Sequence, residues 1–178
     1  MIAKSASRRF YGKFRGTVFQ NFDPDGKGRI LVMVPDVFGV MPSTWATPCV
    51  PFTGLAQTGM FVLPQIGASV WVEFEHGDSN YPIWSGGFWG SKVGVPLPAA
   101  FDPPTAPGVV IQTAGQNTVW ISGNPISGIS LSVGPPGAPT SPGILISEAG
   151  IMIQDGKGGS ITLTEGVVTV NLGALIVK

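Results

Sequence analysis

The sequence predicts an all-β protein in which a small barrel precedes a strand-rich tail that is stable only as a homotrimer. Helical periodicity is almost absent, because no window of a dozen residues both lacks glycine and proline and repeats apolar residues at helical spacing. Instead, 26 glycines and 17 prolines punctuate a chain that is 43% hydrophobic, which is typical of many short strands joined by turns. Only 11% of the residues are charged, which favours a protein that hides much of its surface against partners.

Residues 14–90 have the pattern of one compact unit. In the segment 68–75, Val70, Val72 and Phe74 alternate with polar or exposed positions, as in a strand with one buried face. The segment 23–28, Asp-Pro-Asp-Gly-Lys-Gly, is a strong turn signal. Several short strands in about 75 residues predict a closed or nearly closed barrel, which leaves few exposed edges. We expect strands at residues 14–19, 29–35, 44–50, 59–63, 68–75 and 81–87.

A proline-rich stretch separates this unit from the tail. Residues 95–108 carry five prolines, so we expect an extended, semi-rigid linker there. The sequence therefore predicts a basic N-terminal arm at 1–13, a barrel domain at 14–92, a linker at 93–108 and a strand domain at 109–178.

The tail is a crude internal repeat of short apolar strands. Between residues 143 and 174 the strands recur every seven to nine residues, and the proline-rich piece 134–143 is expected to loop outward. Alone, this tail would be a narrow meander with two open edges and apolar side chains on both faces, which is too little burial for stability. Three copies around a threefold axis, with each strand pairing with the next chain, would bury Ile, Leu and Val. We expect strands at 109–111, 119–121, 129–131, 144–146, 151–153, 161–163, 167–170 and 174–177.

The order of motifs in residues 16–90 resembles the OB-fold domain of the phage baseplate assembly protein V family. The motifs are Gly16 to Pro35, Ser43-Thr44-Trp45-Ala46, Gly59 to Ala68, Val72 to Asp78 and Tyr81 to Gly87. This family includes the central spikes of contractile phage tails and the valine-glycine-repeat spikes of type VI secretion systems. The tail is similar to the intertwined triple-stranded β-helix, or prism, that follows the barrel in those proteins.

The resemblance implies a structural, non-enzymatic function. It implies a homotrimeric central spike at the baseplate centre, below the tail tube, that contacts tube, hub and wedge proteins and pierces a cell envelope when the sheath contracts. No cofactor, metal or catalytic residue is implied. The protein would assemble in the bacterial cytoplasm and then join a phage tail or an extracellular particle, touching the target membrane only transiently. The chain shows no signal peptide and no apolar run long enough to span a bilayer.

Two departures from the family bear on the tip of such a spike. No lysozyme domain stands between barrel and tail, and the single histidine excludes an iron tip built from His-x-His. The tail instead closes on an apolar strand. We expect a separate tip protein of the proline-alanine-alanine-arginine (PAAR) type to dock on Leu175, Ile176, Val177 and Lys178.

The N-terminal fifteen residues hold five basic residues and no acid. They form either a solvated arm or a surface that docks on an acidic tube or hub protein. The residues concerned are Lys4, Arg8, Arg9, Lys13 and Arg15.

Other chemistry is weakly supported. Asp23 and Asp25 hint at a calcium loop, but Lys27 and Val34 occupy positions where ligands are required, so a turn is favoured. His76 has no second histidine to share a metal, and a hairpin turn is favoured there too. The single cysteine, Cys49, is expected to be a small buried residue, and the lack of a disulfide fits a reducing cytoplasm.

The alternative function is an OB-type nucleic-acid or glycan-binding module with a trimerising β-stalk, using aromatic side chains as stacking platforms. Zero net charge argues against nucleic acid, and core or intersubunit packing is the favoured role of these rings and of Trp120. The candidate platforms are Phe14, Phe19, Phe22, Trp45, Phe61, Trp71, Phe74, Trp84, Phe88 and Trp89.

Overall fold

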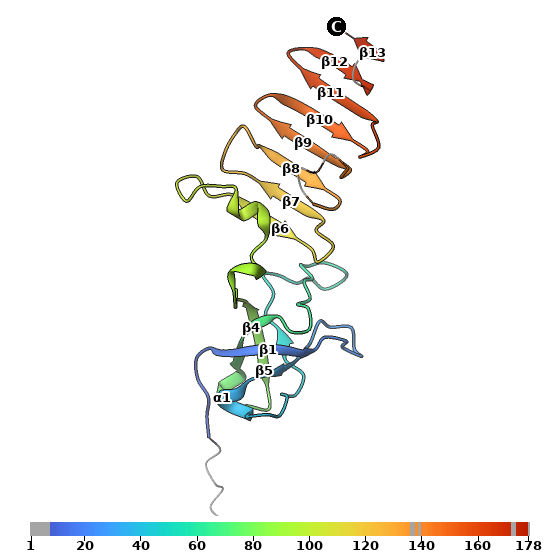
Figure 1. Cartoon of the computed structure of the whole chain (residues 1–178). Coiled ribbons are helices and arrows are strands. Elements are labelled where there is room, and N and C mark those ends of the chain that lie inside the picture. Colours follow the sequence, from blue (N-terminus) through green and yellow to red (C-terminus); the bar gives the residue numbers. More distant parts are fainter. Residues whose placement is uncertain (1–7, 136–137, 139, 172–173, 178) are drawn as a thin grey trace, which may run out of the picture. The chain divides into compact units, whose positions relative to one another are not determined.

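The computed structural model describes residues 8–135, 138, 140–171 and 174–177. The chain divides into two compact units, Met1–Lys92 (unit 1) and Val93–Lys178 (unit 2). Each unit is built around one β-sheet, with a few helical turns of three or four residues (Figure 1). The predicted all-β fold is confirmed. Among the described residues, no helix is long and apolar enough to cross a membrane.

Unit 1 is a five-stranded sheet in the order β2-β1-β4-β5-β3. β1 pairs antiparallel with both β2 and β4, β4 pairs antiparallel with β5, and β3 pairs parallel with β5. Its elements are β1 Phe14–Gln20, β2 Leu31–Met33, α1 Pro35–Phe38, β3 Thr47–Pro48, β4 Ser69–Phe74, the 3-10 turn η1 Glu75–Gly77 and β5 Pro82–Gly87.

A pair of backbone hydrogen bonds closes the sheet of unit 1 into a barrel. Ile30, just before β2, and Ala46, just before β3, form an antiparallel bridge. The Ile30 N–H donates to the Ala46 carbonyl at 3.1 Å, and the Ala46 N–H donates to the Ile30 carbonyl at 2.8 Å. Because this bridge joins the two outer strands of the sheet, the predicted closed barrel is confirmed.

The barrel interior holds a compact apolar core. Val70, Val72 and Phe74 of β4 point inward, as their alternation predicts, and the Trp84 indole N–H donates to the Gly28 carbonyl at 3.1 Å. The rings of Phe10, Phe14 and Phe38 pack around Phe74 at one end of the core. The buried residues are Val18, Ile30, Val32, Val34, Ala46, Val70, Val72, Phe74 and Trp84.

Two details of unit 1 differ from the prediction. Residues 35–38 form a helical turn, because Pro35 occupies a first-turn position that its fixed φ favours. Residues 59–63 do not form a strand. Gly59 bridges Thr53, and the Met60 N–H reaches the Phe52 carbonyl, but the next partner is Pro51, which has no N–H to continue the ladder.

Unit 2 is an antiparallel meander in which each strand pairs with its neighbours in sequence. All eight strands expected in the tail are present. They are β6 Val109–Gln112, β7 Thr118–Ile121, β8 Ile129–Ser132, β9 Gly143–Ser147, β10 Gly150–Gln154, β11 Ser160–Thr164, β12 Val167–Val170 and β13 Leu175–Val177.

The proline-rich linker is folded rather than extended. It contains two 3-10 turns, η2 Lys92–Gly94 and η3 Leu97–Ala100, and η3 lies against β6. Asp102 fixes the linker to β7, because its carboxylate accepts a hydrogen bond from the Trp120 indole N–H at 2.9 Å and another from the Ser122 hydroxyl. These hydrogen bonds hold the pKa of Asp102 below its usual value. A charged side chain thus anchors a segment that composition alone presents as a spacer.

Candidate assembly interface

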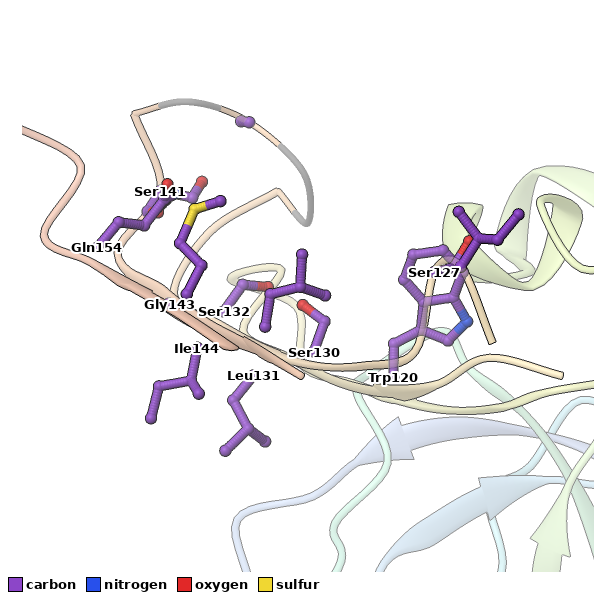
Figure 2. Close-up of a pocket in the computed structure, with 13 residues that line it drawn as sticks. Trp120, Ser127, Ser130, Leu131, Ser132, Ser141, Gly143, Ile144 and Gln154 are labelled. Atoms are coloured by element: carbon purple, nitrogen blue, oxygen red, sulfur yellow. Dashed lines mark hydrogen bonds between the residues drawn. The ribbon is translucent and has the colours of Figure 1, made fainter. Parts of the chain in front are cut away.

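The sheet of unit 2 has two chemically different faces. Along each strand, exposed Ile, Val or Leu residues alternate with partly buried residues. Figure 2 shows this separation, with Ser130 and Ser132 on one side of the sheet and Leu131 and Ile144 on the other. The expectation of apolar side chains on both faces holds only in part. Most of the Ile, Val and Leu side chains gather on one face, which we call the ladder face, whereas the other face carries Val110, Trp120, Leu145 and Met152 among polar side chains.

The strand register lines these side chains up into two continuous columns. Each residue of a column stands directly opposite the next one across the strand pair. Side chains that stand directly opposite each other on neighbouring antiparallel strands are close enough to pack together and stabilise the sheet. One column is Val109, Ile121, Ile129, Ile146, Ile151, Leu163 and Val168. The other is Ile111, Val119, Leu131, Ile144, Ile153, Ile161, Val170 and Leu175.

The ladder face is uncovered in the single chain. Its side chains from β6 to β11 are between 36% and 64% exposed, whereas core residues of unit 1 are at most 7% exposed. A contiguous apolar surface of this extent on a soluble protein marks an interface. Fully burying an exposed side chain of this kind contributes roughly 1.5–3 kcal/mol, so completing the burial of these partly covered side chains adds a fraction of that each, and their sum favours association through this face.

Charged residues of unit 2 lie at the turns and leave the ladder face without charge. Glu148 and Glu165 occupy hairpin turns, and Asp155 and Lys157 lie in the connection between β10 and β11. The Asp155 carboxylate accepts backbone hydrogen bonds from Lys157 and Gly159, which lower its pKa. Since no position of either column is charged, the ladder face matches the charge-depleted centre of a protein interface.

The structure differs from the expected strand-by-strand pairing between chains. The backbone ladders of β7 to β12 are filled on both sides by strands of the same chain, and β6 and β13 are the outer strands of the sheet. The side chains of the ladder face, rather than most of the backbone, are therefore available to join copies.

The opposite face is more polar and partly covered by loops. Ser141 lies against it, since Ser141 is buried and its carbonyl accepts a hydrogen bond from Gln154 at 2.9 Å. A groove of about 430 Å³ is lined by Ala138 and Ser141 together with side chains of the sheet (Figure 2). Trp120 packs against Phe101 of the linker with ring centroids 6.0 Å apart, so its predicted packing role is confirmed.

Two family signatures match the chain and follow the division into units. Residues 14–89 match the type VI secretion system/phage-baseplate injector OB domain. Residues 108–176 match the phage baseplate V C-terminal trimerisation domain, which is the segment that carries the ladder face. The chain belongs to the phage baseplate V spike family. No curated protein matches the chain. The description of the second match as a trimerisation domain supports a homotrimer for this baseplate V family member.

The basic residues near the N-terminus are largely engaged within unit 1. Arg9 lies 3.7 Å from the Asp78 carboxylate and donates to the His76 carbonyl. Lys13 lies 3.1 Å from the Glu73 carboxylate, an interaction that lowers the pKa of Glu73. These contacts attach residues 8–13 to the barrel. They reduce the charge that is available to a partner and disfavour a freely solvated arm.

Two further basic residues contact aromatic rings, and the fifth is not described. The Arg15 guanidinium lies 4.8 Å from the ring centroid of Phe88 and 5.4 Å from that of Trp71. Arg8 contacts only the Phe10 ring, at 5.1 Å, and Lys4 lies outside the described residues. Among Arg8, Arg9, Lys13 and Arg15, Arg8 therefore has the fewest contacts in its own chain.

The residues expected to dock a tip protein lie on or beside the outer strand β13. Leu175 is 56% exposed and ends one of the two apolar columns. The side chains of Ile176 and Val177, and all of Lys178, lie outside the described part of the chain.

The suggested calcium loop is a turn held by an arginine. The Asp23 carboxylate accepts hydrogen bonds from the backbone N–H groups of Asp25, Lys27 and Arg29. The Arg29 guanidinium lies 2.6 Å from it and holds the pKa of Asp23 well below its usual range. The guanidinium occupies the place of a cation, and the predicted turn is confirmed.

Other candidate sites are exposed or packed. His76 lies in the predicted turn with its side chain 90% exposed, and no group of three or more His, Cys, Asp or Glu suited to a metal occurs in the residues described. Cys49 is exposed, so its predicted burial is wrong; it directly follows β3 at the barrel surface. Of the proposed stacking platforms, Phe74 and Trp84 are core residues, and the Trp71–Phe88 pair is covered by Arg15.

Proposed function

We propose that this chain is the central spike of a contractile tail or injection machine, located at the baseplate centre below the tail tube. The observation that carries the proposal is the ladder face, with its two uncharged apolar columns on a segment that matches a trimerisation domain. Three such sheets with their ladder faces turned to a common axis form a prism with a continuous apolar interior.

A prism of this kind suits a mechanical function. Within each sheet, backbone hydrogen bonds join β6 to β13 in an unbroken series. Between sheets, the close-packed apolar side chains resist sliding, because displacing one strand misaligns both columns. The spike would thus transmit the force of sheath contraction to a target envelope without any chemical step.

Three partner contacts follow from this position. Tube and hub proteins would contact unit 1, with Arg8 and Lys4 as the candidate charges, and wedge proteins would surround it. A PAAR-type tip protein would cover the β13 end, where Leu175 is exposed. The protein would be made in the cytoplasm of a bacterium and carried in an assembled particle.

Two measurements test this function. Native mass spectrometry of the purified chain should give a trimer, and immunogold electron microscopy of contractile particles should place the label at the baseplate end. A monomer, or label along the tube, would contradict the proposal. A DNA-binding assay over a range of salt and a cell-wall turbidity assay should both be negative; salt-dependent DNA binding would favour the OB-type binding module instead.

A further inference from the structure

Unit 1 carries a long segment without any charged residue. Between Asp36 and Glu73, residues 37–72 contain no Asp, Glu, Lys, Arg or His. In contrast, several charged residues elsewhere in unit 1 form local pairs, such as Arg9 with Asp78, Lys13 with Glu73 and Arg29 with Asp23. The surface formed by residues 37–72 therefore exposes no charged side chain, and the charges of unit 1 lie on the rest of the barrel.

Part of this segment is a short hairpin, closed by a single β-bridge, that presents apolar side chains to solvent. Gly59 bridges Thr53, the Gly54 N–H donates to the Thr58 carbonyl at 2.7 Å, and the Thr58 hydroxyl donates to the Ala56 carbonyl. At its tip Leu55 is fully exposed. The other exposed large apolar side chains of this region are Phe52, Met60, Phe61, Val62, Leu63 and Ile66.

Exposing these apolar side chains to water is energetically unfavourable for a monomeric barrel. Ordering a hairpin has an entropic cost, and here the ordered tip makes no apolar contact that would offset it, because Leu55 is fully exposed. Exposed apolar patches of this kind mark interaction surfaces or cause aggregation. A surface that must be soluble before meeting a separate protein usually retains charge, whereas permanent interfaces are the more hydrophobic ones.

We propose that the hairpin surface, residues 50–66, packs against unit 1 of a second copy of this chain. This inference rests on the proposed trimer. The trimerisation segment on the same chain holds the copies together and gives each barrel a high effective concentration of its neighbours. A second copy is thus the partner that is present as soon as the chain folds, and it can cover the uncharged surface before aggregation competes.

The structure supplies a reporter and a matched control for this contact. Cys49, the only cysteine in the sequence, is exposed directly before the hairpin surface. Its neighbours Pro48 and Val50 line a groove together with Met60 and Phe61. Tyr81 is an exposed residue of similar accessibility to Phe61, 61% against 67%, but it lies in a hollow with Arg9, Glu75 and Asp78. Tyr81→Glu therefore adds a charge to unit 1 outside the hairpin surface.

The decisive experiment places a photo-reactive phenylalanine analogue at position 55 of the full-length chain. Illumination of the purified trimer should give products with the mass of two or three chains. Products confined to a single chain's mass, or no crosslink between chains in a sample whose native mass is a trimer, overturn this inference and leave the proposed spike intact. A monomeric native mass overturns both.

Thiol labelling provides the second measurement. Cys49 should react with a maleimide on the order of tenfold more slowly in the native trimer than in the Leu55→Glu trimer, since the charge opens the contact while unit 2 keeps the chains together. Tyr81→Glu should leave the slow reaction unchanged. Equal, fast labelling of the unmodified and Leu55→Glu trimers would contradict the contact and indicate a surface reserved for another baseplate protein.

Discussion

Units 1 and 2 bury their apolar side chains in different ways. In the described parts of the chain, the buried aliphatic and aromatic side chains belong to unit 1 apart from Pro98, and Ile30, Val32 and Val72 are completely inaccessible. In unit 2, which is of similar length, the apolar residues of the ladder face stay open to solvent. Both units are antiparallel for the most part and rich in valine and isoleucine, so composition does not cause the difference.

The difference comes from whether the sheet closes. In unit 1 the Ile30–Ala46 bridge joins the outer strands, and the inward face becomes a core within one chain. In unit 2 the outer strands β6 and β13 lie at opposite ends of eight strands, so the ladder face has no other side to pack against. A closed sheet makes its own core, whereas an open sheet with one apolar face supplies part of a core that other copies complete.

The largest expected effect is loss of the trimer on placing a charge on the ladder face. Ile161→Asp would bury a carboxylate in each copy at the centre of the assembly, which costs several kcal/mol per copy. Thr162→Asp, on the same strand but the opposite face, is the matched control and should stay trimeric. Analytical ultracentrifugation distinguishes them, and a trimeric Ile161→Asp protein would show that the ladder face is not the interface.

A second prediction uses protein concentration to separate the two cores. Ile30→Ala removes a fully buried side chain from the barrel and should lower the free energy of unfolding of unit 1 by about 2–5 kcal/mol at any protein concentration. Ile161→Ala should lower stability to an extent that decreases as concentration rises, because its core forms between chains. Urea titrations at two concentrations a hundredfold apart would measure this, and concentration-independent loss for both variants would refute the distinction.

Local patterns in the sequence predict the strands of both units well. The alternation of Val70, Val72 and Phe74 identifies the inward face of β4, and each apolar triplet of the tail becomes a strand. Part of the one-sidedness of unit 2 was also visible in triplets with a polar middle residue, such as Ile129-Ser130-Leu131 and Ile161-Thr162-Leu163, whereas Ile144-Leu145-Ile146 is apolar throughout. Individual triplets do not predict the register in which neighbouring strands pair. The two continuous columns exist only because that register places the apolar residues directly opposite one another.

Features that depend on distant contacts were not predictable in the same way. The folded linker depends on Asp102 meeting Trp120 and Ser122, and the engagement of Lys13 depends on Glu73 and Ser85. Cys49 was expected in the core because free cysteine is usually a small buried residue, but it lies at the surface. Apolar sequence predicts burial only when the partner that covers it belongs to the same chain.

A smaller, pH-dependent effect is expected at the β1–β2 turn of unit 1. Arg29 and three backbone N–H groups lower the pKa of Asp23, so the folded state binds fewer protons than the unfolded state near the ordinary Asp pKa of about 3.9. The stabilisation is present above that pH and declines as the pH falls below it. Asp23→Asn should lower the urea midpoint of unit 1 at pH 7, and the difference from the unmodified protein should shrink towards pH 2.

Asp36→Asn, which removes one exposed carboxylate from α1, is the control for loss of a negative charge. It should shift the urea midpoint far less at pH 7. If Asp23→Asn and Asp36→Asn behave alike across this range, the Asp23–Arg29 contact does not stabilise the turn.

The smallest expected effect is local and concerns the anchor of the linker in unit 2. Asp102→Ala removes the acceptor of the Trp120 and Ser122 hydrogen bonds, so the linker should detach more often from β7 while the trimer persists. Hydrogen exchange should accelerate by about tenfold in residues 97–112 and remain unchanged in β9 to β12. Thr105→Ala, an exposed change in the same linker, should leave exchange unaltered. If exchange instead accelerates throughout the sheet, the linker is a structural part of the trimerisation domain. A peripheral segment could detach without this effect, because the strands of the sheet keep their backbone hydrogen bonds to one another.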